Sequence, residues 1–144
     1  QDFCSLLATE ADKFSTDTEI KIVHNFTEGH EKELRVEKCT CEFLHSVLTE
    51  CLNNGIRHGS ATQFFVHLTC DSAHIKLMVS DNGVGLEGLS EAEKKNRLDN
   101  GYGLRKMREY IMAHAGVFKV DGDDGFQIQV ELPLTTGTKG KEEQ

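Results

Sequence analysis

Three segments of this 144-residue chain alternate apolar and polar residues, and this pattern constrains the fold more than any other feature. The segments are residues 62–70, 74–81 and 126–134. Such alternation predicts strands of a sheet with one buried and one solvent-exposed face, as in antiparallel sheets, rather than a sheet buried on both sides. Shorter strands are expected at residues 20–26 and 117–120.

Three other stretches carry apolar residues at helical spacing, and we expect them to cover the buried face of the sheet. The strongest is residues 39–57; the others are residues 2–14 and 103–115. The apolar stripe of the strongest helix comprises Phe43, Leu44, Val47, Leu48, Cys51, Leu52 and Ile56. The expected fold class is therefore α+β: a two-layer α/β sandwich with a mixed, mainly antiparallel sheet and helices on one face. We expect a single domain over residues 1–135, followed by a disordered polar tail over residues 136–144.

Composition excludes several kinds of protein. The formal net charge of −8 argues against a nucleic-acid surface, which needs a basic stripe. No apolar run approaches the roughly 20 residues of a membrane span, and no signal-peptide pattern opens the chain. The five cysteines form no CxxC motif and are interpreted as reduced thiols of a cytoplasmic protein. Cys39, Cys41 and His45 do not have the usual spacing of zinc ligands.

Two short glycine clusters are the main functional signal. Residues 81–85, Asp-Asn-Gly-Val-Gly, end a predicted strand, and residues 101–104, Gly-Tyr-Gly-Leu, open a predicted helix. Glycines let backbone N–H groups approach phosphates closely, and a helix N-terminus offers unpaired donors and a favourable dipole for anionic oxygens. In this order the clusters predict a nucleotide site.

The long helix carries three polar residues on one stripe, because Glu50, Asn54 and Arg57 stand at i, i+4 and i+7. Glu and Asn supply the oxygen ligands that a phosphate-bound Mg²⁺ prefers. A solvated helix edge is the alternative for each residue taken alone. His58 projects near the apolar arc and is expected to be a packed, hydrogen-bonded core residue.

Asp81 has the same parity as Ile75, Leu77 and Val79, so it is expected to point inward. A carboxylate there costs several kcal/mol unless it is paired or hydrogen-bonded. One interpretation is an acceptor for the exocyclic amine of adenine at the floor of a pocket. The alternative is an Asp that caps the Asp-Asn-Gly turn.

Residues 83–88 also satisfy GxGxxG after a strand, which raises the possibility of a Rossmann dinucleotide site. That fingerprint requires a helix opening at the glycines and then a parallel strand. Residues 90–100 are charged and lack apolar periodicity, so this interpretation is disfavoured. The chain also lacks a GxxxxGK[ST] P-loop and the HRD and DFG motifs of protein kinases.

Taken in order, these motifs resemble the catalytic, ATP-binding domain of sensor histidine kinases, within the GHKL ATPase superfamily. The N-box of that family resembles Glu50-x-x-x-Asn54-x-x-Arg57-His58, and the two glycine boxes resemble residues 81–85 and 101–104. Residues 103–109 are similar to the subgroup whose kinases pair with response regulators carrying helix-turn-helix output domains. The resemblance covers about residues 6–134 and implies the Bergerat sandwich as the fold and Mg-ATP as the ligand.

The resemblance also implies roles for individual residues. Asp81 would hold adenine within the Asp81-x-Gly83-x-Gly85 turn, where Gly85 leaves room for the base. Asn54 would ligate Mg²⁺, and Glu50 would assist it or orient the reacting group.

On the phosphate side, the resemblance places Arg57 near phosphate and makes Gly101, Gly103 and Leu104 the phosphate-side turn. Residues 86–100 would be a lid, mobile because it carries few apolar anchors. The lid has no phenylalanine, so the family's phenylalanine box is absent, and Tyr102 is bulkier than the small residues expected there.

A sensor kinase also needs a helical dimerisation domain with a phosphoacceptor histidine followed by Asp or Glu. His30-Glu31 is the only superficial match, and it lies in an irregular charged stretch. The resemblance therefore implies an ATP-dependent protein histidine kinase domain whose acceptor lies on a separate domain, in a cytoplasmic location that leaves membrane anchoring of a longer parent protein open. The alternatives are an anti-sigma-type serine-protein kinase and a degenerate nucleotide-binding interaction module.

Overall fold

The computed structural model describes residues 3–18, 20–25, 37–58, 60–71, 73–100 and 103–134. Its sheet has the strand order β1-β2-β3-β5-β4. The strands are β1 (Lys21–His24), β2 (Gln63–Cys70), β3 (His74–Asp81), β4 (Val117–Asp121) and β5 (Gln127–Pro133). The helices are α1 (Phe3–Thr18), α2 (Lys38–Arg57), α3 (Glu91–Asn100) and α4 (Leu104–Ala113).

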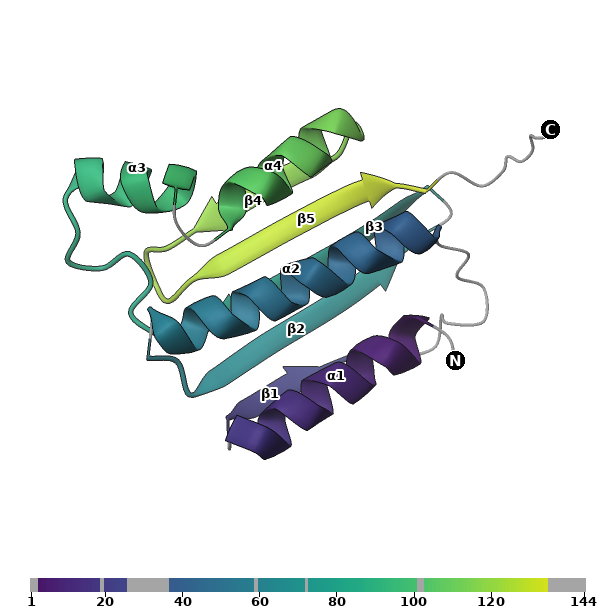
Figure 1. Cartoon of the computed structure of the whole chain (residues 1–144), viewed down its shortest axis with the longest axis horizontal. Coiled ribbons are helices and arrows are strands. Elements are labelled where there is room, and N and C mark those ends of the chain that lie inside the picture. The colour runs from purple at the N-terminus through teal and green to yellow at the C-terminus, as the bar shows by residue number, and fades with distance from the viewer. Residues whose placement is uncertain are drawn as a thin grey trace.

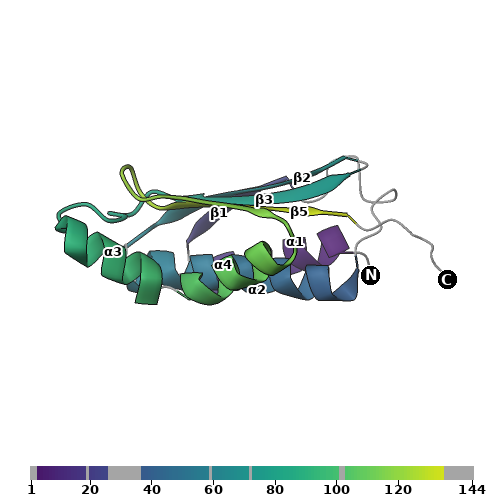
Figure 2. The same ribbon diagram turned by 90° about the horizontal axis from the view of Figure 1, so that it is seen from above.

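The molecule has two layers, with α1, α2 and α4 on one face of the sheet (Figures 1 and 2). Strand β1 is parallel to β2, whereas the β2–β3, β3–β5 and β4–β5 pairs are antiparallel. The expected fold class, a two-layer α+β sandwich with a mixed, mainly antiparallel sheet, is confirmed. Helix α3 stands at one end of the layers, beyond the strands (Figure 2).

The buried face of the sheet is the one that the alternation predicts. Register places Val66 opposite Val79 and Leu68 opposite Leu77, so apolar side chains from neighbouring strands meet on the same face. Helix α2 fills the layer above with residues that are at most 8% exposed, and Phe14 of α1 meets Phe64 of β2 edge to face with ring centroids 6.4 Å apart. The buried residues of α2 are Phe43, Leu44, Val47, Leu48, Cys51, Leu52, Asn54 and Gly55.

Two details of α2 differ from expectation. Ile56, assigned to the apolar stripe, is 37% exposed, and His58 is exposed rather than packed in the core. The cause lies at Gly55, where a Cβ atom would meet the ring of Phe64 at 2.5 Å. The last turn of α2 therefore faces the sheet through Asn54 and Gly55, which turns Ile56 outward.

Helix α3 is the one described helix that the periodicity analysis misses. Its N-terminal end is fixed by polar contacts instead: Ser90 Oγ accepts the Glu93 N–H at 3.1 Å, and Glu93 Oε1 accepts the Ser90 N–H at 2.9 Å. This reciprocal pair is a capping box, and Ser-x-x-Glu at residues 90–93 was its signal in the sequence. Although a helix follows the GxGxxG pattern, β3 has only antiparallel neighbours in the described sheet, so the strand arrangement of a Rossmann site is absent there.

Within the described ranges, no helix is long and apolar enough to cross a membrane. Several sequence-based predictions concern residues outside those ranges: Phe26 of the first strand, His30-Glu31, Gly101, Tyr102 and the tail over residues 136–144.

Candidate functional site

Asp81 ends β3 and is held by the backbone on one side of its carboxylate. Its Oδ1 accepts the N–H groups of Gly83 at 2.8 Å and of Phe126 at 3.2 Å. Its Oδ2 points toward α2 and lies 3.0 Å from the position that a Cβ atom of Gly55 would take. The two interpretations of Asp81 are therefore compatible, because one oxygen caps the turn while the other faces the helix layer.

Burial raises the pKa of the Asp81 carboxyl above its ordinary value, and the N–H groups of Gly83 and Phe126 lower it only in part. A raised folded-state pKa means that this group favours the folded state at low pH, and that the advantage is lost as pH rises through that pKa. At neutral pH the ionised Asp81 therefore costs folding stability. A half-buried carboxyl with a raised pKa makes Asp81 a candidate functional residue.

Gly55 of α2 packs against Phe64 of the sheet beside this carboxylate. A methyl group at Gly55 would lie 2.5 Å and 2.6 Å from Cζ and Cε1 of Phe64, whose side chain is fully buried. Nothing in the sequence beyond the glycine itself pointed to this contact. Glycine here lets α2 sit close to the sheet beside Asp81.

We expect Gly55→Ala to lower the free energy of unfolding by about 1–3 kcal/mol, because overpacking a filled core forces side chains off their rotamers. Denaturant unfolding of the nucleotide-free chain measures this change. The double variant Gly55→Ala/Phe64→Leu removes the two clashing ring carbons, so its loss should be smaller than the sum of the two single losses. Strict additivity would show that the contact is not the cause.

The first glycine box is interlocked with the turn between β4 and β5. Gly85 has φ +61°, and a Cβ there would lie 2.2 Å from the carbonyl oxygen of Gly125. Gly125 in turn, at φ +75°, would place a Cβ 2.1 Å from the carbonyl oxygen of Asp81. Backbone packing thus demands glycine at both positions. The sequence showed this second segment only as a turn, and a role of Gly85 in leaving room for a base stays a prediction.

The N-box residues meet the second glycine box across the α2–α4 seam. A Cβ at Gly103, which has φ +69° and precedes the first residue of α4, would lie 2.9 Å from Cγ and Cδ of Glu50. Leu104 beside it is fully buried and anchors the start of α4. A groove of about 300 Å³ runs along this seam. Its lining residues are Phe43, Ser46, Glu50, Gly103, Lys106, Met107 and Tyr110.

Asn54 is 5% exposed, the only polar or charged side chain among the described residues that is buried. Glu50 lies one helical turn away. Burial raises the pKa of the Cys51 thiol, and the negative charges of Asp81 and Glu50 raise it further. Both carboxylates are therefore near Cys51, and a shared site of Glu50, Asn54 and Asp81 stays a prediction.

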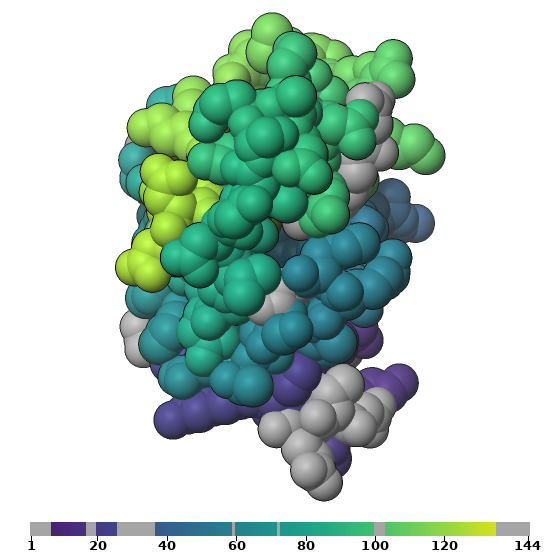
Figure 3. Space-filling view, turned by 90° about the vertical axis from the view of Figure 1, so that its left-hand side faces the viewer, coloured from purple at the N-terminus to yellow at the C-terminus, as the bar shows by residue number. Residues whose placement is uncertain are grey.

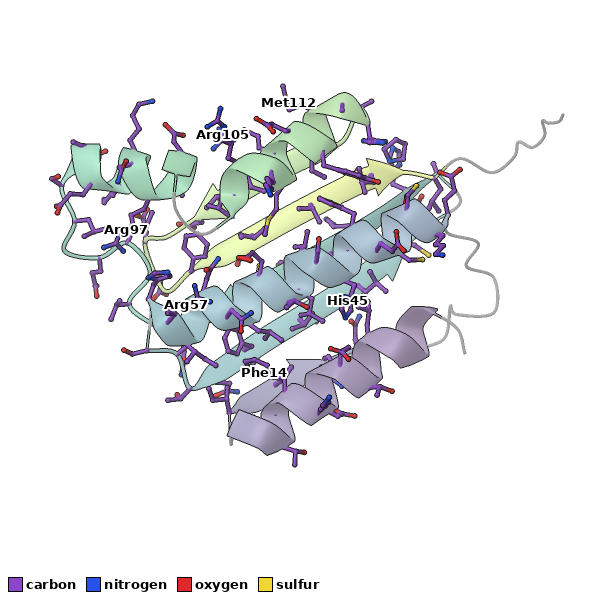
Figure 4. The ribbon with its side chains drawn as sticks, viewed as in Figure 1. Phe14, His45, Arg57, Arg97, Arg105 and Met112 are labelled. Carbon is purple, nitrogen blue, oxygen red and sulfur yellow. The ribbon has the colours of Figure 1, made fainter. Side chains whose placement is uncertain are left out.

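A basic cluster stands at the C-terminal end of α2. Partial desolvation lowers the pKa of the exposed His58, and the positive charges of Arg57 and Arg97 lower it further. Figure 4 shows Arg57 and Arg97 at the same end of the molecule, although one comes from α2 and the other from α3. Sequence reasoning proposed Arg57 alone; Arg97 was missed because no helix was expected there.

The segment between the glycine boxes is anchored more firmly than expected. Leu86 is 5% exposed, and Leu89 and Leu98 pack against the core. Figure 3 faces this end of the molecule and shows α3 between the β4–β5 turn and α2.

A two-layer sandwich whose long helix carries Glu and Asn beside a strand-end Asp and two glycine turns defines a nucleotide-binding ATPase domain of the GHKL class. Comparison with known proteins assigns the family. Residues 39–136 match the family described as histidine kinase-, DNA gyrase B- and HSP90-like ATPase, and the chain belongs to that family. ATP is accordingly the ligand of the domain.

Curated relatives narrow the class. The sensor histidine kinase MctS of Rhizobium johnstonii is 30% identical over 106 residues, which cover 73% of this chain and 22% of MctS. The sensor histidine kinase LiaS of Bacillus subtilis is 28% identical over 114 residues, which cover 78% of this chain and 30% of LiaS. The chain thus spans less than a third of the length of these relatives, and the resemblance to sensor histidine kinases is confirmed.

Solved structures agree on the fold. The ATP-binding domain of PrrB from Mycobacterium tuberculosis superposes with a TM-score of 0.66 at 17% identity, covering 94% of this chain and 96% of that domain. A blue-light activated histidine kinase of Erythrobacter litoralis gives a TM-score of 0.68 at 16% identity, covering 95% of this chain and 43% of the kinase.

Proposed function

We propose that this chain is the Mg-ATP-binding catalytic domain of a sensor histidine kinase, and that it donates the γ-phosphoryl group to a histidine on a separate dimerisation domain. The observation that carries the proposal is the contact between Glu50 and Gly103, because it brings the N-box and the second glycine box to one place. Phosphoryl transfer is mostly positioning and charge neutralisation, so such a site needs few chemical groups.

The residues present fit a magnesium ion that arrives with the nucleotide. Mg²⁺ is commonly held by one or two side-chain oxygens together with substrate phosphates, and Asn54 and Glu50 offer such oxygens one helical turn apart. Across the described residues, no group of three or more His, Cys, Asp or Glu side chains could hold a metal by itself. When bound, the ion would neutralise charge on the transferring phosphoryl group.

In this proposal the remaining residues bind and enclose the nucleotide. Asp81 Oδ2 accepts the exocyclic amine of adenine, and the turn through Gly83 and Gly85 forms the wall beside the base. The N-terminal end of α4 at Gly103 faces the phosphates, and Arg57 adds positive charge near them. Residues 86–100, with α3 at their centre, form the lid.

We expect the chain alone to bind Mg-ATP without phosphorylating itself. His24, His67 and His74 lie in strands, and His45 belongs to α2. In-line transfer needs a nucleophile about 3–3.5 Å from phosphorus, which only a separate helical domain is expected to deliver. Incubation with γ-labelled ATP, followed by an assay for acid-labile, alkali-stable phosphate, tests this. Stoichiometric label on this chain alone would contradict the proposal, and label mapped to His30 would identify that histidine as the acceptor.

The decisive experiment supplies the missing acceptor. A purified dimerisation domain of a sensor histidine kinase should acquire acid-labile phosphate from this chain and Mg-ATP, whereas the same domain with its acceptor histidine replaced by alanine should not. Acid-stable phosphate on a serine of an offered partner would instead favour the anti-sigma-type kinase. ATP binding without transfer to any acceptor would favour the interaction module.

A further inference from the structure

Arg108 joins the two helices that flank the phosphate side of the site. Its Nη2 donates to the carbonyl oxygen of Leu98 at 3.2 Å and lies 3.5 Å from Oδ1 of Asp99. Both acceptors belong to the last turn of α3, whereas Arg108 lies on α4, one turn after Leu104. One guanidinium therefore contacts both a backbone carbonyl and a side-chain carboxylate of the neighbouring helix.

The contact satisfies a group that helix α3 cannot satisfy by itself. The last four carbonyl groups of a helix have no intrahelical partner, and the Leu98 carbonyl is among them. The two N–H bonds of Nη2 have fixed directions in the guanidinium plane, so this one nitrogen can serve two neighbouring acceptors. Arg108 therefore supplies a partner for a carbonyl at the end of α3.

The side of α3 that carries this contact also borders an open space. A cavity of about 610 Å³ lies between α3 and the β4–β5 turn, lined by Lys94, Lys95 and Leu98 on one side and by Asp121 and Gly122 on the other. Arg108 also lines this cavity. A helix beside a cavity has few packing partners there, so its position depends strongly on the packing of Leu98 against the core and on the contacts of Arg108.

We infer that Arg108 is a positioning residue that holds α3 against α4 and thereby sets the affinity for nucleotide. Helix α4 connects Arg108 to the nucleotide site. It begins at Leu104, directly after Gly103, and Gly103 packs on Glu50. Displacement of α3 would open the lid side of the same site. The part of this inference that concerns nucleotide rests on the proposed function.

The test compares Arg108→Gln with two charge-matched controls in the full chain. Arg105→Gln removes an arginine from the same helix, where Arg105 pairs only within α4 with Glu109 at 3.4 Å. Lys95→Gln removes the other cation that contacts Asp99, at 3.3 Å, but within α3 itself. Each control residue has its ion pair within its own helix, so neither substitution should separate α3 from α4.

Hydrogen exchange of the residue 91–100 amides in the nucleotide-free chain gives the first readout, and calorimetric ATP affinity the second. For Arg108→Gln we expect exchange in α3 to accelerate by about two- to tenfold, with ATP binding weakened by a similar factor, as suits a partly exposed charged contact. Arg108→Lys should recover part of both effects. Asp99→Asn, which keeps the carbonyl contact, should have a smaller effect than Arg108→Gln.

Unchanged exchange in α3 would overturn the inference, as would equal effects of Arg105→Gln and Arg108→Gln. Faster exchange with unchanged ATP affinity would overturn the coupling between lid position and nucleotide. If the wild-type chain bound no ATP, the proposed function would fail with that coupling, and the exchange measurement would still decide whether Arg108 holds α3.

Discussion

Asp81→Asn is expected to weaken ATP binding more than tenfold while leaving the fold intact. Oδ1 of Asp81 accepts two backbone N–H groups, so the amide oxygen of an asparagine will take that place and its NH₂ group will occupy the Oδ2 position. A donor then faces the exocyclic amine of adenine, which is also a donor. Loss of a hydrogen bond to a buried charged group is worth about 1.5–3 kcal/mol, which exceeds tenfold in affinity.

Asp71→Asn is the matched control for this experiment. Asp71 Oδ1 also accepts two backbone N–H groups, from Ala73 at 2.7 Å and from His74 at 2.8 Å, but in the turn at the other end of β3. Calorimetry should therefore show wild-type ATP affinity for this control.

The wild type should bind GTP poorly, because guanine presents a carbonyl where adenine has its amine. Equal affinities for ATP and GTP would show that Asp81 does not recognise the base.

Asn54→Ala is expected to reduce phosphotransfer to a supplied dimerisation domain by at least about 100-fold. A magnesium ion that lacks one ligand is misplaced and loses several kcal/mol of charge stabilisation, and each 1.36 kcal/mol changes the rate about tenfold. Asn54→Asp should also impair transfer, because it alters the charge at the metal. Nucleotide binding in the absence of Mg²⁺ should change less in both variants. Initial transfer rates, together with thermal melts in ATP with and without Mg²⁺, measure these effects.

Asn53→Ala provides the control, since it deletes the same side chain one position away on α2, where Asn53 is only partly buried. It should retain the wild-type gain in melting temperature with Mg-ATP. If Asn54→Ala gained as much stability from Mg-ATP as the wild type, Asn54 would be a structural residue of the helix and no metal ligand.

The sequence predicted the sheet well because side-chain alternation reports burial directly. Val66, Leu68, Leu77, Val79 and Val130 are all buried as expected, since a one-residue shift would move every one of them to solvent. The parity argument also placed Asp81 correctly. The predicted apolar stripe of α2 was also correct over most of its length, because helical spacing reports burial in the same way.

The errors arose where contacts between distant residues decide the structure. Ile56 was assigned to the core because a helical wheel does not reveal the close approach of Gly55 to Phe64. Helix α3 was missed because periodicity detects only apolar faces, whereas this helix is defined by a capping box and by ion pairs such as Lys94–Glu91 at 3.5 Å. The interlock of Gly85 with Gly125 joins segments 40 positions apart and leaves no local pattern.

That interlock bears on the stage of synthesis at which the chain can bind nucleotide. Asp81 receives one of its two backbone donors from Phe126, and β5 lies between β3 and β4 in the finished sheet. A nascent chain that has emerged only as far as α4 already contains Glu50, Asn54, Asp81 and Gly103, but the carboxylate lacks the donor that completes its orientation. We therefore expect nucleotide to stabilise the chain mainly after β5 has docked, so that ATP acts on a completed domain rather than as a template for its folding.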